Sequence, residues 1–300
     1  MKQVRLIILS LMLGMSSWVC SQELYVGTYN IRYDNSEDRR EGNDWTSRCP
    51  VVCGQLNFEH PDIFGAQEVL HPQLLDMLSQ LDGYEYKGCG RDDGKEKGEY
   101  APIFYDPKVV KKVDGGWFWL SETPDVASMG WDAACTRICT WGLFEHIESG
   151  KEFYFFNLHM DHRGMTARRE SSKMVLERVK EAMETGRPVV LTGDFNADQR
   201  DDVYKTFTES GDMLDCYVHA RIRFAENGTF VDYKQDLLTD SRIDHVFVSP
   251  SIKVDRYGIL TNTYWKASGR RDRYGYYRDA DRRLPSDHYP VFVRLILVES

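Results

Sequence analysis

The chain has 300 residues, of which 42% are apolar and 13% aromatic, and its formal net charge at pH 7 is −9. This composition excludes a disordered chain, because it supplies enough apolar side chains for a sizeable core. The acidic balance gives no general attraction for long nucleic acids, which proteins bind through many lysine and arginine contacts to phosphate.

The first 21 residues have the pattern of a secretory signal. Lys2 and Arg5 give a positive start, an apolar run covers residues 7–15, and an exit follows at residues 19–21. The run is too short to remain as a membrane span, and a buried first strand or helix is the alternative. We predict a signal at 1–21, one domain at 22–300 and an exported monomer, periplasmic or extracellular. Lipid attachment at Cys20 stays open. Removal of the signal takes the formal charge from −9 to −11.

Short β-branched or aromatic runs bounded by turn residues predict strands at 25–31, 63–67, 102–105, 117–120, 140–147, 153–159, 189–192, 244–248 and 291–298. Helices are predicted at 46–59, 72–81 and 166–183, the last from Met174, Val175, Val179 and Met183 at helical spacing. No repeat or low-complexity linker separates these segments. We therefore expect one core, built from two packed sheets with helices outside.

Of the seven cysteines, six follow the predicted signal: Cys49, Cys53, Cys89, Cys135, Cys139 and Cys216. An even number in an exported chain permits disulfides, and spacing alone does not determine their pairing. The two Cys-x3-Cys pairs lack the short spacing of a zinc knuckle, and no nearby histidine completes a ligand set. We expect small buried side chains or one or two disulfides.

Acids, amides and imidazoles stand at the ends of the predicted strands. They include Asn30, Gln67, Glu68, Asn157, His159, Asp194, Asn196, Asp244, Asp287 and His288. Singly, each has an ordinary structural explanation, such as a turn, a helix cap or a satisfied interior histidine. Together they predict a site at a sheet rim, where a rigid scaffold presents convergent side chains. Because oxygen donors dominate, the set suits Mg²⁺, or Mn²⁺, better than zinc.

These residues also carry a family resemblance. The segments Thr28-Tyr-Asn-Ile-Arg, Gln67-Glu, Asn157-Leu-His, Gly193-Asp-Phe-Asn-Ala, Arg242-Ile-Asp-His and Ser286-Asp-His resemble, in order, the signature of the endonuclease/exonuclease/phosphatase (DNase-I-like) superfamily. The resemblance runs from about residue 24 to 298 and extends to a bacterial exported branch of that group. It implies an α/β fold, a four-layered sandwich of two packed mixed β-sheets flanked by helices.

The resemblance also implies roles for the strand-end residues. Glu68 is the expected principal metal ligand, with Asn30 and Asp287 beside it, since a cation there would neutralise charge on phosphate oxygens. Asp194 is similar to the residue that orients or deprotonates the attacking water, and Asn196 to its partner.

Two histidines are expected to face the phosphate. His288 would stabilise the transition state or transfer a proton, and Asp244 resembles the acid that orients this imidazole. His159 is similar to the second phosphate-facing histidine, and the Asn-Leu-His segment favours the DNase and phosphatase branches over apurinic endonucleases.

Several charged residues outside the signature are candidates for substrate binding. Arg163 and Arg168 could bind a second charged group of the substrate, or simply form helix-entry ion pairs. Arg137 could face phosphate or pair with an acid, and Glu99 could reach the site from a loop or lie in solvent.

A predicted loop at 266–283 carries seven basic residues against three acidic ones, a local excess of +4, interleaved with tyrosines and preceded by Trp265. Arginine contacts phosphate and aromatic rings stack on planar groups, so this loop could help choose a substrate. Solvated surface is the alternative.

The sequence thus predicts a secreted, metal-dependent hydrolase of phosphate esters, a phosphodiesterase or phosphatase that activates water. The acidic chain favours small or lipid-linked substrates over nucleic acid. The alternatives are a secreted DNase-like endonuclease and a non-catalytic protein that binds phosphate or glycan.

Overall fold

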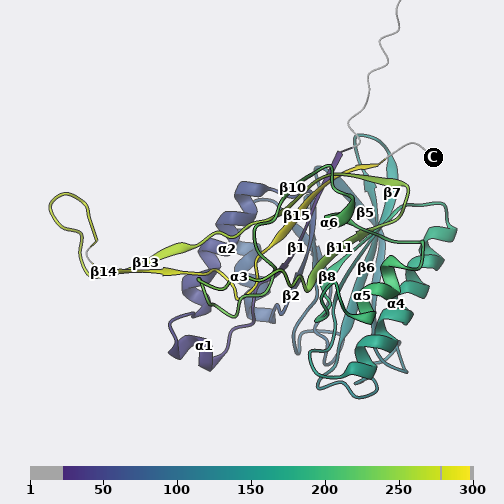
Figure 1. The fold of residues 1–300 in the computed structure, drawn as a ribbon, viewed down its shortest axis with the longest axis horizontal. Coiled ribbons are helices and arrows are strands. Elements are labelled where there is room, and N and C mark those ends of the chain that lie inside the picture. The colour runs from purple at the N-terminus through teal and green to yellow at the C-terminus, as the bar shows by residue number, and fades with distance from the viewer. Residues whose placement is uncertain (1–22, 278, 298–300) are drawn as a thin grey trace, which may run out of the picture.

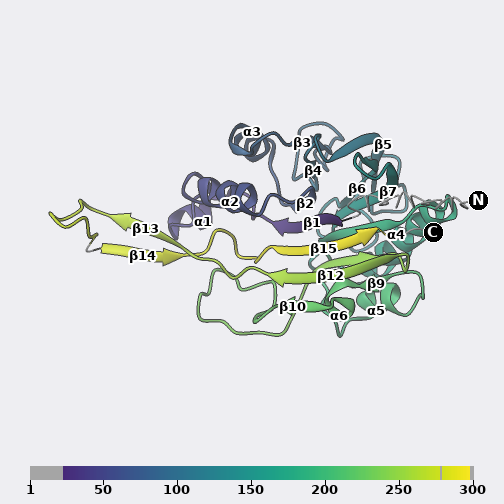
Figure 2. The same ribbon diagram turned by 90° about the horizontal axis from the view of Figure 1, so that it is seen from above.

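The computed structural model describes residues 23–277 and 279–297. The predicted signal and Cys20 lie outside these residues. Two large β-sheets pack face to face, and helices cover their outer faces (Figures 1 and 2). Within the described ranges, no helix has the length and apolar composition that crossing a membrane requires.

The first sheet has seven strands in the order β10-β12-β15-β1-β2-β4-β3. Its central strand β1 runs parallel to β2 and antiparallel to β15. The strands span Glu23–Asn30 (β1), Ile63–Gln67 (β2), Glu85–Lys87 (β3), Ile103–Tyr105 (β4), Ile222–Phe224 (β10), Ile252–Ile259 (β12) and Val291–Leu297 (β15).

The second sheet has six strands in the order β5-β6-β7-β8-β11-β9, with β7 and β8 parallel and β8 and β11 antiparallel. Its strands span Val110–Trp119 (β5), Ile138–His146 (β6), Lys151–His159 (β7), Val189–Asp194 (β8), Leu214–Asp215 (β9) and Asp244–Val248 (β11).

Helices cover each sheet on the side away from the other sheet. Helices α1 (Ser36–Arg40), α2 (Trp45–Glu59) and α3 (His71–Gln80) belong to the first sheet's side, where a buried apolar cluster joins α2 and α3 to β1, β2 and β4. Helices α4 (Met165–Glu184) and α5 (Asp202–Thr208) pack on the second sheet, and the short α6 (Cys216–His219) follows β9. The predicted four-layered α/β sandwich is therefore confirmed (Figure 1).

A largely apolar layer fills the space between the two sheets, with Phe144, Phe153 and Phe155 among its buried members. One fully buried amide crosses this layer near the site. Asn157 of β7 donates from Nδ2 to the carbonyl oxygens of Ala66 (2.8 Å) and Pro102 (2.9 Å), which belong to the first sheet's side. Its Oδ1 accepts from Gln67 Nε2 at 2.7 Å. Asn157 thus joins the two sheets beside the strand ends.

The sequence prediction of elements was incomplete. It omitted helices α1, α5 and α6 and strands β3, β9, β10 and β12, and it shortened β5 to its second half. The segment 266–283 was predicted as a loop, but most of it forms a hairpin, because β13 (Tyr264–Ser268) pairs with β14 (Asp279–Arg283). No disulfide joins the six cysteines within the described chain, and all of them except the partly exposed Cys135 are buried.

Candidate active site

A cavity of about 530 Å³ opens where strands of both sheets end. Its lining combines acids, imidazoles and guanidinium groups with a small apolar part: Arg32, Tyr33, Glu68, Arg91, Glu99, Cys135, Arg137, His159, His162, Asp194, Asn196, Phe230, Ile243, Asp287 and His288. Another cavity, of about 340 Å³, lies beside α4 and is lined mainly by aromatic rings, without such a cluster of acids and imidazoles.

Strand register explains why residues distant in sequence meet here. Asn30 ends β1 opposite Gln67 at the end of β2, and His159 ends β7 opposite Asp194 at the end of β8. Both pairs of strands are parallel, so their carboxyl ends lie at the same edge. Asp194 also pairs with Asp244, the first residue of the antiparallel β11. The strand-end residues predicted from sequence are therefore brought together.

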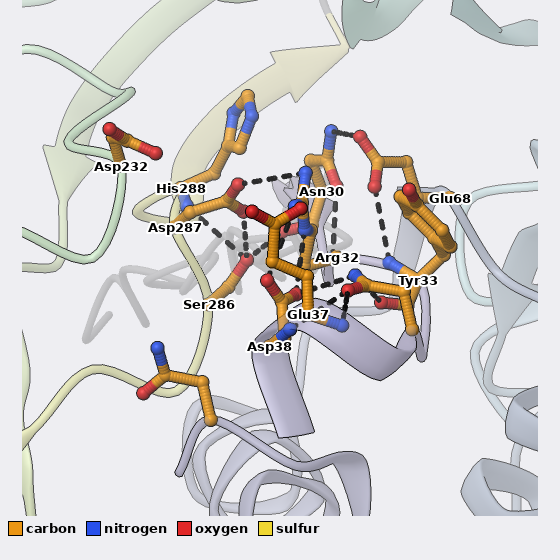
Figure 3. Close-up of polar contacts among 12 residues, drawn as sticks. Asn30, Arg32, Tyr33, Glu37, Asp38, Glu68, Asp232, Ser286, Asp287 and His288 are labelled. Carbon is orange, nitrogen blue, oxygen red and sulfur yellow. Dashed lines mark hydrogen bonds and ion pairs between the residues drawn. The ribbon is translucent and has the colours of Figure 1, made fainter. Parts of the chain in front are cut away.

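Glu68 lines the cavity, and the buried Asn30 lies against it (Figure 3). The fully buried Asn30 amide donates from Nδ2 to Glu68 Oε1 (3.0 Å) and to Asp194 Oδ2 (2.9 Å). The second Glu68 oxygen accepts the backbone N–H of Tyr33 at 3.1 Å. Glu68 has φ +62°, a conformation that costs a non-glycine residue about 1–3 kcal/mol and that clusters at functional sites.

Asp287 also lines the cavity, next to the guanidinium of Arg32 (Figure 3). Arg32 Nη1 is 3.4 Å from Asp287 Oδ2, and Ser286 Oγ is 3.2 Å from Oδ1. Burial raises the pKa of Asp287; of the nearby charges, His288 and Arg32 lower it and Glu68 raises it. A buried carboxylate whose ionisation is opposed by burial and by a neighbouring carboxylate, with hard oxygen atoms toward a cavity, fits a divalent cation.

Fit to a cation is less direct for Asn30, because its Nδ2 donates to Glu68 and Asp194 and its Oδ1 accepts the backbone N–H of Arg32 at 3.0 Å. The Asn30 side-chain amide would have to turn before its oxygen could bind a cation at this place. Carboxylate and imidazole atoms also converge within 4.8 Å in two sets that share Asp194, one with Glu68 and His159 and one with Asp244 and His288.

Asp194 lies at the centre of the cluster. Its Oδ2 is 3.5 Å from His159 Nε2 and 3.7 Å from His288 Nε2, and its Oδ1 accepts the backbone N–H of Asn196 at 2.9 Å. Burial, together with the charge of Asp244, raises the pKa of Asp194 to about 7. A carboxylate with this pKa and two imidazoles within reach can take up a proton near neutral pH.

His288 is held by Asp244, whose Oδ2 lies 2.8 Å from His288 Nδ1. Burial lowers the pKa of His288, but the charge and hydrogen bond of Asp244 outweigh it and raise the pKa to about 10. The ring is therefore an imidazolium at neutral pH, with Nε2 directed toward Asp194. Phe230 packs against it, with ring centroids 4.9 Å apart.

His159 has the opposite character. Its Nε2 is 3.2 Å from the side-chain nitrogen of Asn196, which also donates to the Met160 carbonyl at 2.9 Å. Burial, followed by the charges of Arg137 and Arg91, lowers the pKa of His159 well below its usual value. At one pH, a neutral His159 can accept a proton or a hydrogen bond, whereas the charged His288 can only donate.

A second wall carries guanidinium–carboxylate pairs. Arg91 makes two hydrogen bonds of 2.8 Å to the oxygens of Glu99. Arg137, only 4% exposed, lies 3.4 Å from Asp161 and 3.0 Å from His162 Nδ1. Its Nη1 and the Nε of Arg91 are buried and have no hydrogen-bond partner among the described residues. Such groups favour an anionic or hydroxyl-bearing ligand in the cavity.

The structure places the other two candidate arginines outside the cavity lining. Arg163 is exposed, and Arg168 donates to the backbone carbonyl of Asp161 at 2.9 Å. Neither lines the described cavity. Their assignment as substrate-binding residues stays a prediction.

Sequence reasoning gave no role to several residues that shape the site. Arg32 stood in the Asn-Ile-Arg segment, whose spacing gave no indication of contact with Asp287. Arg48 of α2 is fully buried and donates to the carbonyls of Ile31 (2.6 Å), Arg32 (3.0 Å) and Pro285 (3.0 Å). It thereby holds the segment after β1 against the segment before β15.

Comparisons with known proteins agree with this geometry. The model of the Endonuclease/Exonuclease/phosphatase family matches residues 27–288. A solved mannosyl-6-phosphatase of Bacteroides thetaiotaomicron is 47% identical, with a TM-score of 0.86 over 91% of this chain and 99% of that chain. An endonuclease/exonuclease/phosphatase family protein of the same species is 46% identical, with a TM-score of 0.88 over 93% and 100%. One from Bacteroides vulgatus is 38% identical, with a TM-score of 0.80 over 92% and 99%.

Proposed function

Because this chain belongs to the endonuclease/exonuclease/phosphatase family of phosphoester hydrolases, we propose that it is an exported, metal-dependent phosphatase that removes phosphate from a small sugar phosphate. The observation that carries the proposal is the cavity in which Glu68, Asp194, His288 and the guanidinium wall converge. The likeness to a mannosyl-6-phosphatase, at 47% identity over nearly the whole chain, supports the choice of a sugar phosphate.

Glu68 and Asp287 would hold the cation, with Asn30 either as an oxygen ligand after its amide turns or as the group that positions Glu68. When bound, Mg²⁺ or Mn²⁺ would supply positive charge for the phosphate oxygens as negative charge grows on them. Arg32, 3.4 Å from Asp287, would supply additional positive charge on the same side.

Asp194 would orient the attacking water and accept its proton. Its pKa of about 7 without a cation is compatible with this task near neutral pH. Asn196 would hold Asp194 through its backbone N–H and hold His159 through its side chain. This arrangement keeps the proton acceptor and the phosphate-facing ring in fixed relative positions.

His288 would donate a hydrogen bond from Nε2 to a phosphate oxygen and stabilise its negative charge. Asp244 would fix the ring through the 2.8 Å bond to Nδ1, and so keep Nε2 protonated and directed into the cavity. Asp244 does not line the cavity and therefore acts as a positioning residue.

The sugar would lie between the second wall and Phe230. Paired carboxylate and guanidinium groups, such as Glu99 with Arg91, match hydroxyl groups that both donate and accept hydrogen bonds. A partly exposed ring such as Phe230 offers an apolar surface to the carbon face of a sugar. The cavity volume of about 530 Å³ is in the range of small-molecule sites.

Phosphate release from a panel of esters tests this function. The panel contains mannose 6-phosphate, glucose 6-phosphate, an inositol phosphate, bis-p-nitrophenyl phosphate, sphingomyelin and duplex DNA, each with Mg²⁺ or EDTA. We expect metal-dependent release from hexose phosphates, lost in Glu68→Gln and retained in Glu96→Gln, whose target side chain is 74% exposed. Cleavage of DNA with no release from sugar phosphates would identify a nuclease instead. No turnover by a folded protein would favour a binding protein.

A further inference from the structure

The hairpin of β13 and β14 forms an arm, residues 264–283, that projects from the rest of the structure beyond α2 (Figures 1 and 2). The two strands pair at five positions, from Tyr264 with Arg283 to Ser268 with Asp279. The tip, residues 269–277, joins them. A two-stranded ribbon alone in water is only marginally stable. A protruding ribbon with no covering layer adds little to the stability of the fold, which suggests that it contacts another molecule or surface.

The tip concentrates arginine and tyrosine. Tyr274 and Tyr276 are 67% and 68% exposed. The guanidinium of Arg273 lies over the Tyr274 ring at 4.6 Å, and that of Arg271 over the Tyr277 ring at 5.0 Å. These contacts leave the N–H groups of the arginines available, because a cation–π contact uses the face of the guanidinium.

Acidic groups do not neutralise this tip. Asp272 uses its Oδ1 to accept the backbone N–H groups of Tyr274 and Tyr276, and so shapes the turn. Asp281 pairs with Arg283 at the base of the arm, at 3.4 Å, whereas the guanidinium groups of Arg271 and Arg273 at the tip contact tyrosine rings. The tip therefore presents three cationic side chains and three tyrosines to solvent.

The base of the arm is anchored, so the tip keeps its direction. Lys266 Nζ binds Asp44 Oδ2 at 2.7 Å, and Arg283 Nη1 donates to the Glu41 carbonyl at 2.8 Å. Arg282 Nε donates to Gln235 Oε1 at 2.8 Å. No described residue of the arm lines the active-site cavity. The arm therefore does not select a small substrate by contact in that cavity.

We propose that the tip docks the protein on an anionic lipid surface by binding phosphate-bearing headgroups. A convex tip cannot enclose a small ligand, which needs a concave site, and it is small for a stable protein–protein interface. A headgroup layer needs neither a pocket nor close shape complementarity. Arginine attracts anionic lipids, and tyrosine favours the interface between water and hydrocarbon.

Charge separation along the molecule makes this docking possible for an acidic protein. The arm carries +4, so the remainder of the chain without its predicted signal carries −15. Five strand pairs at about 3.3 Å each place the tip about 17 Å beyond the arm's base. This is about twice the Debye length of about 8 Å at physiological ionic strength. Repulsion between the acidic body and an anionic surface is thus largely screened when the tip makes contact.

Vesicle co-sedimentation of the full mature chain tests the proposal. The vesicles contain phosphatidylcholine alone or with 30% phosphatidylglycerol, at physiological and at high salt. We expect binding that requires phosphatidylglycerol and weakens in high salt. The triple variant Arg270→Gln, Arg271→Gln, Arg273→Gln should lower the partition coefficient about 100-fold, since each arginine near an anionic surface contributes about 1 kcal/mol and 1.4 kcal/mol is tenfold.

A charge-matched control replaces Lys173, Arg178 and Lys180 on the exposed face of α4 by glutamine, and should keep vesicle binding. Hydrolysis of a soluble ester by both triple variants checks that they are folded. Equal binding to neutral vesicles, or an equal loss in the control, would overturn the proposal. So would an arm that instead binds duplex DNA, or one whose arginines change the oligomeric state measured by light scattering, without any binding to vesicles.

Discussion

Replacing Asn157 by alanine is expected to lower the free energy of unfolding by about 3 kcal/mol. The Asn157 side chain makes four hydrogen bonds across and along the sheets, to Ala66, Pro102, Gln67 and Thr192. It is fully buried, so no water replaces these bonds when the amide is removed. A buried polar group left without a partner costs about 1–3 kcal/mol.

The expected decrease in the free energy of unfolding is smaller than the sum for four lost hydrogen bonds, because three of the partners of Asn157 keep other hydrogen bonds. Gln67 still donates to Thr28, Thr192 still donates to Phe156, and the Pro102 carbonyl still accepts the Ala66 N–H. One poorly satisfied carbonyl and a small cavity remain, which together give about 3 kcal/mol.

Asn57 provides the matched control. Its amide donates to the Gln80 carbonyl at 2.8 Å and accepts from Asp82 N at 3.0 Å, but both contacts are at the surface. Water can replace them, so Asn57→Ala should cost less than about 1 kcal/mol. Urea unfolding followed by circular dichroism measures both variants. An Asn157→Ala loss no larger than that of Asn57→Ala would refute the inference that this amide joins the sheets.

Three further outcomes are expected. Asp62 accepts the Tyr25 N–H, and burial raises its pKa to about 6. The folded protein therefore binds this proton more tightly than the unfolded chain, and the resulting stability at low pH is lost as pH rises through 6. Asp62→Asn should be the more stable protein by about 2 kcal/mol at pH 8 and about equal at pH 4, in urea titrations at the two values. Asp244→Asn should lower kcat about 100-fold without changing Mg²⁺ affinity measured by calorimetry, and a lost affinity would contradict a role through His288 alone. Arg137→Lys should raise KM for the sugar phosphate about tenfold with kcat little changed, whereas Arg187→Lys, which lies outside the cavity lining and pairs with Glu152, should leave both constants as they are.

The strand ends were predictable because they combine two strong local signals. A β-branched or aromatic run followed by an acid, amide or imidazole marks both a buried strand and its rim, as in the segments that end at Asn30, His159 and Asp194. Their ordered resemblance to a known family then indicated which sheets they would form. The four-layered architecture followed from that resemblance more than from the pattern alone.

Contacts made through turns and long-range packing were not predictable. β12 alternates lysine, aspartate and arginine with its buried residues, and β5 contains Asp114 and two glycines, so neither has a simple apolar run. The Arg91–Glu99 pair depends on the path of a glycine-containing turn between them. Ion pairs of this kind are set by tertiary structure, because spacing along a loop does not fix distance in space.

Neither the strands of the arm nor its direction could be predicted from the sequence. Its composition indicated a charged loop, but the two aromatic residues at its start, Tyr264 and Trp265, fit a strand equally well. The direction of the hairpin away from the cavity comes from its anchors at Asp44 and Glu41, which lie more than two hundred residues earlier in the chain.

The most direct test of the central claim compares phosphate release from mannose 6-phosphate by the native chain and by Asp194→Asn, with Mg²⁺ and with EDTA. Asp198→Asn, in the loop that follows β8 but outside the cavity lining, serves as the control. The account predicts metal-dependent release that falls at least about 100-fold in Asp194→Asn, as expected for loss of a general base, and persists in Asp198→Asn. Release that survives EDTA, or that Asp194→Asn retains at the native rate, would contradict it.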